Sequence, residues 1–447
     1  MSSRYDRITL HSALPGRPTP YGDPMHKPGR TDTGTHPLLI LISSGPHKYR
    51  EYLLSAISTR YRVHLIDTVE PTWQSPYLVG NTVVSSTDLE LVSAAAFEIA
   101  SRETVQGVLS WDEARVHQAA AVAGRLGLPT TPAEAVWRCR DKHQSRSALA
   151  LEGVPQPAFA LVGNVEEALT AAAGIGYPVV VKPRAAAASF GVSLVRSPQE
   201  MTECFGFADQ ATVPHMPDYN QAVLVEEYLD GPEVSVDSVV VGGRVRPLFV
   251  GHKQIGYPPY FEETGHVVSH GDPLLADPLF LDLLQETHTA LGFTEGWTHT
   301  ELKLSSSGAP KVIEVNARLG GDLIPYLGMA ASGINPGLIA AAVACGRDPE
   351  IDVERDLVAA VRFLYVDHDD TVIDSVEFDT AALPPEIDQA VVLAAPGDIV
   401  SPPPRGLLSG RVAFVTAIAA KVEECEAALD AAAAALRVVE RDRTETR

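Results

Sequence analysis

Apolar runs and amphipathic stretches alternate through the first third of the chain. A continuous apolar run at Leu38–Ile42 is followed by a helical pattern at His47–Thr59, and a second apolar run covers Arg62–Ile66. The alternation continues with strand-like and helical segments in turn: Thr82–Ser85, Leu89–Ser101, Gly107–Leu109 and Glu113–Leu126. Because short apolar strands that alternate with helices are typical of parallel sheets, this pattern predicts a parallel α/β layer.

After residue 177 the pattern changes to short strands with few intervening helices. The predicted strands are Pro178–Lys182, Val192–Val195, Ala222–Tyr228, Val234–Val241 and Val245–Val250. A helix is expected at Pro278–Leu291, before strands at Gly296–Leu304 and Lys311–Ala317. The Ala-rich segment Val422–Val439 is expected to be the final helix. These segments indicate an α+β module, so the predicted fold class is α/β followed by α+β.

Charge and composition narrow the classes of partner. The 447 residues contain 35 Lys and Arg against 57 Asp and Glu, a formal net charge of −22. A surface this acidic repels nucleic-acid phosphates and anionic lipids, so neither a nucleic acid nor a membrane is expected as a partner. No apolar run approaches the roughly 18 residues of a membrane span, and the four cysteines form no CxxC pair. The sequence therefore predicts a cytoplasmic protein that acts on small molecules, and it allows a homodimer.

Polar and apolar residues alternate on two segments near residue 300. In a regular strand, alternate side chains share a face. One face of the second segment then carries Val312, Glu314, Asn316 and Arg318, and the other carries Ile313, Val315 and Ala317. On the first segment, His299, Glu301 and Lys303 share a face. Pairing of the two segments around a turn at Ser305–Pro310 would bring Glu301 and Glu314 together.

Glu301, Glu314 and Asn316 are candidates for a metal site. Two carboxylates and an amide oxygen are hard donors that suit Mg²⁺, with Mn²⁺ as an alternative. Arg318, two residues further along, is suited to hold a phosphoryl group or the charge that develops on it. The other reading is a solvated hairpin face on which Glu314 pairs with Arg318 or Lys303. Lys303 is expected to face solvent.

Upstream residues form a candidate phosphate and nucleotide site. Small residues after a strand let backbone N–H groups approach phosphate oxygens, and acidic residues offer acceptors for an adenine amino group and ribose hydroxyls. The alternatives are an ordinary loop and a solvated strand end. The residues concerned are Lys182 at the end of an apolar strand, Ser189 and Gly191 in the small-residue segment, and Glu226, Glu227 and Glu233 after the next strand.

Motifs of several other sites are missing from the sequence. There is no GxxxxGK[ST] phosphate loop, and Gly174–Ile175–Gly176 lacks the third glycine of a dinucleotide fingerprint. His266 and His270 have i,i+4 spacing, but no HExxH motif is present, so zinc is not favoured.

In their order along the chain, these residues resemble the motif set of the ATP-grasp superfamily. The matching segments are Arg140–Lys142, Val180–Pro183, Ser189–Val192, Glu226–Leu229 with Glu233, Glu301, and Glu314–Arg318. The resemblance in order and spacing covers roughly residues 37–420. The resemblance implies an ATP-grasp fold that holds ATP between two α+β subdomains, with residues 183–200 in a closing lid. It assigns Lys142, Lys182, Ser189 and Gly191 to the phosphates, Glu226, Glu227 and Leu229 to adenine, Glu233 to ribose, and Glu301, Glu314 and Asn316 to Mg²⁺.

Within the superfamily, the chain resembles L-amino-acid ligases of the bacilysin-synthetase type, which join two unprotected amino acids. The resemblance lies in Glu263–His266 and in Arg318, which follows Glu314 by four residues. It implies that Glu263, His266, Gly321 and Asp322 line an amino-acid site and that Arg318 acts catalytically on the phosphorylated carboxylate. Asp322 departs from that type, which has a bulky aromatic residue there. Because Gly265 interrupts it, the segment with Glu263 and His266 is expected to be a loop over the site.

The resemblance also implies a reaction and a division of the chain. The expected reaction is ATP-dependent, ADP-forming ligation of an amino acid, activated as an acyl phosphate, to an amino acid or other amine. The alternatives are ligation of a non-peptide carboxylate to an amine or thiol, and a non-catalytic nucleotide-binding scaffold. The expected parts are a disordered tail (1–36), an N-terminal α/β domain (37–131), a small or lid subdomain with a linker helix (132–232), a catalytic subdomain (233–350) and a C-terminal α+β extension (351–447).

Overall fold

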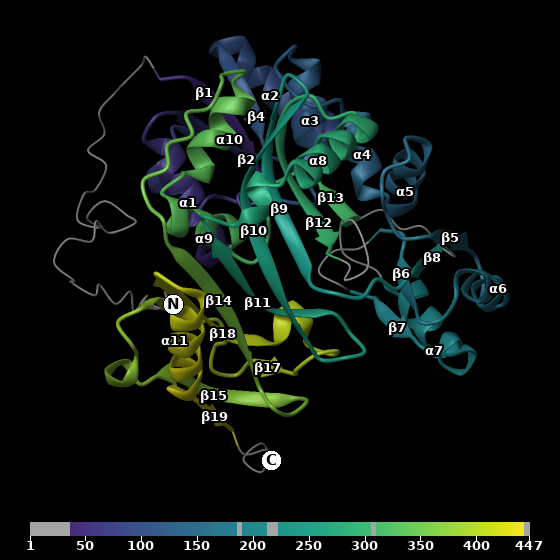
Figure 1. Ribbon diagram of the computed structural model, residues 1–447. Helices are drawn as coiled ribbons and strands as arrows, with labels where there is room; N and C mark the ends of the chain where they lie inside the picture. The colour runs from purple at the N-terminus through teal and green to yellow at the C-terminus, as the bar shows by residue number, and fades with distance from the viewer. Residues whose placement is uncertain (1–35, 186–189, 212–221, 305–309, 442–447) are drawn as a thin grey trace.

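Four sheets with helices packed around them make up the described part of the chain (Figure 1). This computed structural model describes residues 36–185, 190–211, 222–304 and 310–441. The tail expected at residues 1–36 therefore lies, apart from its last residue, outside the described residues.

The first sheet is parallel and has the strand order β3-β2-β1-β4. Its strands are β1 (Leu38–Ile42), β2 (Arg62–Asp67), β3 (Gly80–Val83) and β4 (Val105–Leu109), and its helices are α1 (His47–Ser58), α2 (Leu89–Arg102) and α3 (Val116–Arg125). Strand β1 is buried along its whole length, as a continuous apolar run requires when helices cover both faces of a sheet. The predicted parallel layer is confirmed.

A small antiparallel sheet stands at the right of Figure 1, in the order β5-β8-β6-β7. Its strands are β5 (Phe159–Val162), β6 (Val179–Pro183), β7 (Ser193–Val195) and β8 (Val223–Glu227). Helices α6 (Val165–Ile175) and α7 (Pro198–Asp209) pack on it around a core of their own. Helices α4 (Ala133–Arg140) and α5 (Lys142–Leu151) connect it to the first sheet.

An eight-stranded antiparallel sheet forms the centre of the molecule, in the order β13-β12-β9-β10-β11-β14-β18-β16. Its strands are β9 (Glu233–Val241), β10 (Arg244–Gly256), β11 (Glu262–Ser269), β12 (Gly296–Lys303), β13 (Lys311–Asn316), β14 (Val358–Tyr365), β16 (Ile387–Val392) and β18 (Arg411–Ala419). Because β11 pairs with β14, the sheet continues through the boundary expected at residue 350. The expected catalytic subdomain and C-terminal extension thus share one sheet.

Helices on this sheet join it to the rest of the chain. They are α8 (Pro278–Leu291), α9 (Ile324–Ser332), α10 (Pro336–Ala344) and α11 (Val422–Ala434). Helix α10 contacts both α1 and β4, so one continuous core links the parallel sheet to the long sheet. Within the described ranges no single helix has the length and apolar character of a membrane span, although α9 and α10, bent by 109° at their junction, reach both as a pair.

The final helix is shorter than predicted. It ends at Ala434, and Leu436–Glu440 form strand β19, which pairs with β15 (Thr371–Phe378) beside β17 (Ile399–Val400). The alanine run favours a helix, but the two valines that follow favour the pleated conformation. The predicted helix over Val422–Val439 is therefore wrong in its last turn.

Candidate active site

A cavity of about 140 Å³ lies between the small sheet and the β9, β12 and β13 edge of the long sheet; we call it the central cavity. Most of the residues predicted from the sequence meet there. Its lining includes Lys142, Lys182, Glu226, Glu227, Leu229, Glu233, Glu263, Glu301, Glu314, Asn316 and Arg318, with Lys303, Ile313, Val180 and Phe190 among the remainder.

Lys182 and Glu226 form a buried ion pair at the inner wall, with 2.7 Å between the amine and the carboxylate. Arg146 holds the same carboxylate with two N–H groups, at 2.8 and 3.1 Å. Burial alone would raise the pKa of Glu226, but Arg146 and Lys182 outweigh burial and lower this pKa to about 2. The carboxylate expected to meet adenine is therefore already engaged by two cations.

Arg146 was missed by the sequence reasoning. It also donates hydrogen bonds to the carbonyl oxygens of Val312 and Ile313, at 2.9 and 2.7 Å, and so ties β13 to β8 through one side chain. The signal available in the sequence is its spacing, because a residue four after Lys142 shares that residue's helix face.

Glu301 and Glu314 lie directly opposite each other across the β12–β13 pairing, so the predicted hairpin register is confirmed. Most of the connecting turn, residues 305–309, lies outside the described residues. Each carboxylate carries a lysine: Glu314 pairs with Lys142 at 3.0 Å and Glu301 with Lys253 at 2.8 Å.

Lys253 on β10 is a second residue that the sequence reasoning missed. It is buried and also lies within 3.1 Å of carboxylate oxygens of Glu233 and Glu263, so three acidic residues share one amine. Burial would lower the pKa of Lys253, but the three carboxylates raise it well above its usual value. A lysine within a strand can indicate a carboxylate partner. The sequence does not reveal the partners of Lys253, because they lie on three other strands, β9, β11 and β12.

The strict alternation predicted for β13 is wrong. The register shifts between Glu301 and Leu302, so Glu301 pairs with Glu314 and Leu302 pairs with Val312, with Ile313 left as the extra residue. As a result Val312 packs in the core instead of sharing the face of Glu314, while Ile313 lines the central cavity. A bulge of this kind cannot be read from the hydrophobic pattern, because it adds one residue to one strand only.

Lys303 does not face solvent, contrary to the prediction. Only 9% of it is exposed, and its amine lies 3.3 Å from both the carboxylate of Glu233 and the carbonyl of Gly231. The expected ribose residue Glu233 thus stands between two lysines. Glu227 pairs with Lys311 at 2.9 Å, and both Glu227 and Leu229 line the central cavity.

Arg318 lies where the central cavity meets a second cavity. Its Nε donates a hydrogen bond to the carboxylate of Glu113 at 2.6 Å. Glu113 lies on the loop that follows the parallel strand β4. The pair Glu314–Arg318 expected from a solvated hairpin therefore does not form. Glu113 was missed, although the carboxyl ends of parallel strands are a usual place for functional side chains.

The second cavity, of about 310 Å³, is here called the side cavity. It shares Glu263, Glu301 and Arg318 with the central cavity and extends toward α1 and the parallel sheet. Its other lining residues are Gly45, Pro46, Arg50, Trp111, Asp112, Glu113, Glu262, His299, Gly321, Asp322, Ile324, Leu408 and Arg411. Gly321 and Asp322, both predicted substrate residues, are among them.

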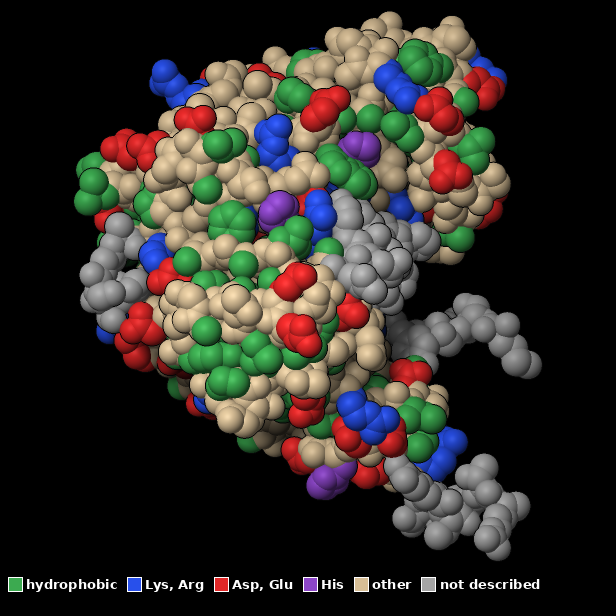
Figure 2. All heavy atoms as spheres, turned by 90° about the vertical axis from the view of Figure 1, so that its right-hand side faces the viewer, with side chains coloured by type: hydrophobic (Ala, Val, Ile, Leu, Met, Phe, Trp, Pro, Cys, Tyr) green, Lys and Arg blue, Asp and Glu red, His purple; other side chains and the backbone are tan. Residues whose placement is uncertain are grey.

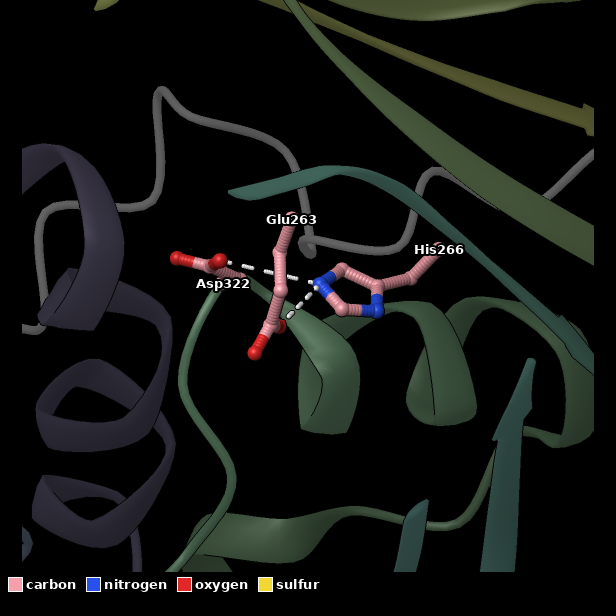
Figure 3. Close-up of side chains that lie close together, drawn as sticks. All are labelled: Glu263, His266 and Asp322. Carbon is pink, nitrogen blue, oxygen red and sulfur yellow. Dashed lines mark ion pairs between the residues drawn. The ribbon is translucent and has the colours of Figure 1, made fainter. Parts of the chain in front are cut away.

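Glu263, His266 and Asp322 lie side by side, with Nε2 of His266 3.1 Å from Glu263 and 3.6 Å from Asp322 (Figure 3). One ligand atom of each lies within 4.8 Å of the others, a spacing that could hold a metal ion. However, Arg411 grips both oxygens of Asp322 at 2.7 and 2.9 Å, and Lys253 pairs with Glu263. The pKa of His266 is lowered by burial but raised more by Asp322 and Glu263. Two cations, Arg411 and Lys253, thus already pair with these carboxylates, as in an ion-pair network.

His266 is fully buried behind Glu263, 3.1 Å from its carboxylate, and lines neither cavity. The segment that carries both residues is strand β11, so the predicted loop is wrong. Gly265 is needed there because β11 and its neighbours approach closely: a Cβ at this position would lie 2.5 Å from the carbonyl oxygen of Val361. A glycine inside a strand can mark close backbone approach and not a break.

The small-residue segment is only partly described. Residues 186–189, with the predicted phosphate residue Ser189, lie outside the described residues. Gly191 has φ +78°, and a Cβ there would lie 2.5 Å from that of Ala211, so only glycine fits. Gly191 does not line the central cavity, although its neighbours Phe190 and Val192 do.

Comparisons with known proteins found similar sequences and a similar fold. Residues 175–326 match the ATP-grasp domain. An uncharacterized Sinorhizobium fredii protein, y4rH, is 28% identical over 85% of this chain and 78% of its own length. Alanine–anticapsin ligase of Bacillus subtilis is 27% identical over 45% of this chain, which spans about half of that protein (46%). The crystal structure of an L-amino acid ligase from Bacillus licheniformis aligns with a TM-score of 0.75 over 91% of this chain and 99% of that one, at 22% identity.

Proposed function

We propose that the chain, whose residues 175–326 match the ATP-grasp domain, is an ATP-dependent, ADP-forming carboxylate–amine ligase. It activates an amino acid as an acyl phosphate and joins it to a second amino acid or another amine. The observation that carries this proposal is the junction of the two cavities at Glu263, Glu301 and Arg318. Paired carboxylates, an arginine suited to bind a phosphoryl group, and a cavity of about 310 Å³ meet there.

ATP occupies the central cavity in this proposal. Lys142 and Lys182 face it from α5 and β6, and each amine now lies within 3.0 Å of a carboxylate. Phosphate oxygens of the nucleotide compete for these amines. Ile313 and Leu229 supply apolar surface for adenine, the backbone around Glu227 supplies its polar contacts, and Glu233 binds the ribose.

Glu301, Glu314 and Asn316 have the chemistry to hold Mg²⁺. All three line one cavity, and the two carboxylates face each other across paired strands. Hard oxygen donors that share a site with phosphates are the usual environment of this ion. When bound, Mg²⁺ supplies neutralisation of phosphate charge and orientation of the transferred group.

The reaction requires activation because a carboxylate is a poor electrophile. A carboxylate oxygen attacks the γ-phosphorus of ATP, the bond to ADP breaks, and an acyl phosphate forms. The amine nitrogen then attacks the carbonyl carbon, phosphate leaves with the bridging oxygen, and the nitrogen loses a proton. Arg318 stabilises the phosphoryl group in transfer and then the tetrahedral oxyanion. Glu113 fixes its guanidinium through the 2.6 Å hydrogen bond.

The activated amino acid lies at the boundary of the side cavity. Glu263 faces both cavities and pairs with the donor's ammonium group, which orients its carboxylate toward the γ-phosphate. Gly321 and Asp322 form the adjoining wall, and His266 acts from behind Glu263 by holding its carboxylate.

A pairwise screen of the twenty common amino acids tests this function. Wild-type protein is expected to release ADP with at least one pair and to yield the matching dipeptide by mass spectrometry, while Glu314→Gln protein purified in parallel yields neither. ADP release that requires coenzyme A instead would replace the amine by a thiol. No ADP release with any amino acid would contradict the proposal.

A further inference from the structure

Arg50 stands out among the cations of the two cavities. Within the described ranges, each of the other Lys, Arg and His side chains that line either cavity has a carboxylate oxygen within ion-pair distance. The pairs are Lys142–Glu314, Lys182–Glu226, Lys303–Glu233, Arg318–Glu113, Arg411–Asp322 and His299–Asp237. Arg50 instead donates one hydrogen bond, to the carbonyl oxygen of Gly320 at 3.2 Å.

Arg50 reaches the side cavity from the first turns of α1, in the N-terminal domain. Its bond to Gly320 places the guanidinium beside the segment that follows Arg318. Burial lowers the pKa of Arg50, and the positive charge of Arg318 adds to this, while Tyr52, Asp237 and Asp322 raise the pKa without outweighing burial. The guanidinium groups of Arg318 and Arg50 face one cavity, and no carboxylate of the described residues lies within ion-pair distance of Arg50. A buried guanidinium in this state is stabilised when an anion binds to it.

We propose that Arg50 binds the α-carboxylate of the amine acceptor, so that the acceptor is an α-amino acid and not a simple amine. This inference rests on the proposed function, which places the acyl phosphate at Arg318. In an α-amino acid, two bonds separate the attacking nitrogen from the carboxylate carbon, a distance of about 2.5 Å. The acceptor's carboxylate must therefore lie next to the reacting carbon, in the part of the side cavity between Arg318 and Arg50.

The chemistry of arginine suits this role. Its planar fork can donate two parallel hydrogen bonds to one carboxylate, and one N–H group of Arg50 remains fixed on Gly320. The other arginine deep in the side cavity, Arg411, cannot serve equally because Asp322 already occupies its fork at 2.7 and 2.9 Å. An anionic side chain on the donor amino acid is the competing source of the same anion, and the test separates the two.

The test compares each acceptor with its carboxamide, which keeps the amine but lacks the negative charge. The acceptor is whichever of the twenty amino acids gives the fastest ADP release, with the donor saturating. Arg50→Ala is expected to lower kcat/KM for the amino acid by about 10- to 100-fold, the usual effect of losing a hydrogen bond between charged groups. It is expected to change kcat/KM for the carboxamide less than about threefold. Arg50→Lys should recover part of the preference, and the exposed Arg60→Ala, with Arg60 just beyond the same helix, should keep all of it.

Hydroxylamine separates a failure of this inference from a failure of the proposed function. It is a neutral nucleophile without a carboxylate and converts an acyl phosphate to a hydroxamate. Wild type and Arg50→Ala are both expected to form hydroxamate from the donor at similar rates. If wild type forms no hydroxamate with any donor, the proposed function fails. If both form it, but Arg50→Ala lowers acid and carboxamide equally, lowers neither, or raises the donor's KM instead, Arg50 does not bind the acceptor's carboxylate.

Discussion

The two cavities differ in how their charges are balanced. In the central cavity the lysines and carboxylates are interlocked, with Lys253 shared by three acidic residues and Glu226 shared by two cations. In the side cavity Arg411 is paired with Asp322, while no carboxylate of the described residues lies within ion-pair distance of Arg50. In the proposed function, the central cavity binds a ligand that carries charges of both signs, the polyphosphate of ATP together with Mg²⁺. In the proposal made above, the side cavity binds a ligand whose carboxylate pairs with Arg50.

The molecular surface has no comparable organisation on the face that is drawn. Figure 2 shows Asp and Glu side chains scattered among Lys and Arg over this face, and not cations gathered into one patch. The absence of a cationic patch on this face agrees with the formal net charge of −22.

Loss of Glu314 should produce the largest effect. Glu314→Ala removes a metal donor and also strips Lys142 of its partner at 3.0 Å. We expect turnover to fall by about a thousandfold or more, with an unchanged circular dichroism spectrum, because the side chain lines a cavity and does not pack in a core. Glu423→Ala, on the exposed face of α11, is the control. Normal ligation by a folded Glu314→Ala variant would remove the metal role.

Replacement of Lys182 should weaken the binding of ATP more than the binding of any amino-acid substrate. Lys182→Ala is expected to weaken ATP binding about 10- to 100-fold by calorimetry, because a cation is lost from the phosphate site. Lys303→Ala, which leaves Glu233 one lysine short, should weaken it less, by a few-fold. Equal ATP affinities for wild type and Lys182→Ala would show that the central cavity does not bind the phosphates there.

Glu263 lines both cavities, and its replacement should affect the KM of the donor and the KM of the acceptor differently. Glu263→Gln is expected to raise the KM of the donor by about tenfold, because the variant lacks the carboxylate that pairs with the donor's ammonium group. The KM of the acceptor is expected to rise much less. Arg318→Ala should instead lower kcat, because its strongest contact forms as charge develops. Ser269→Ala, at the end of the same strand, serves as the control. An unchanged donor KM in Glu263→Gln, with the acceptor saturating, would contradict this assignment.

The smallest effect concerns the opposite face of β12, which faces α8 and lines neither the central nor the side cavity. His288 on α8 is fully buried there, and its Nε2 lies 2.7 Å from the hydroxyl of Thr298. Burial lowers the pKa of His288 from 6.5 to about 4. The unfolded chain therefore binds a proton that the folded chain excludes between these values.

Stability from His288 is thus complete above pH 6.5 and is lost as the pH falls toward 4, by at most about 1.4 kcal/mol per pH unit. Thermal unfolding of His288→Gln should be less sensitive to pH across this window than that of wild type, with unchanged ATP affinity at pH 7.5. Identical pH dependence of the two proteins would contradict the prediction.

The sequence predicts what depends on local pattern. The parallel sheet and the pairing of Glu301 with Glu314 follow from runs and alternation within about ten residues. The bulge at Ile313 and the close approach at Gly265 could not be predicted, since both are set by a neighbouring strand. The ATP side was more accessible to sequence reasoning than the amino-acid side for the same reason.

Partners far apart in sequence explain the residues that were missed. Arg318 and Glu113 are 205 positions apart, and Arg411 and Asp322 are 89 apart. Arg50 lies 270 positions from its hydrogen-bond acceptor Gly320. No spacing rule connects such residues, and only the packing of α1 and β18 around the segment after β13 brings them to one cavity.

The stoichiometry of products tests the central claim most directly. Phosphorus NMR and mass spectrometry of one reaction, with the amino-acid pair that releases ADP fastest, measure all products together. If the protein is a carboxylate–amine ligase that proceeds through an acyl phosphate, it forms equal amounts of ADP, phosphate and amide. ATP is then consumed only when a donor amino acid is present. Formation of AMP and pyrophosphate, or of ADP and phosphate without any amide, would contradict the account.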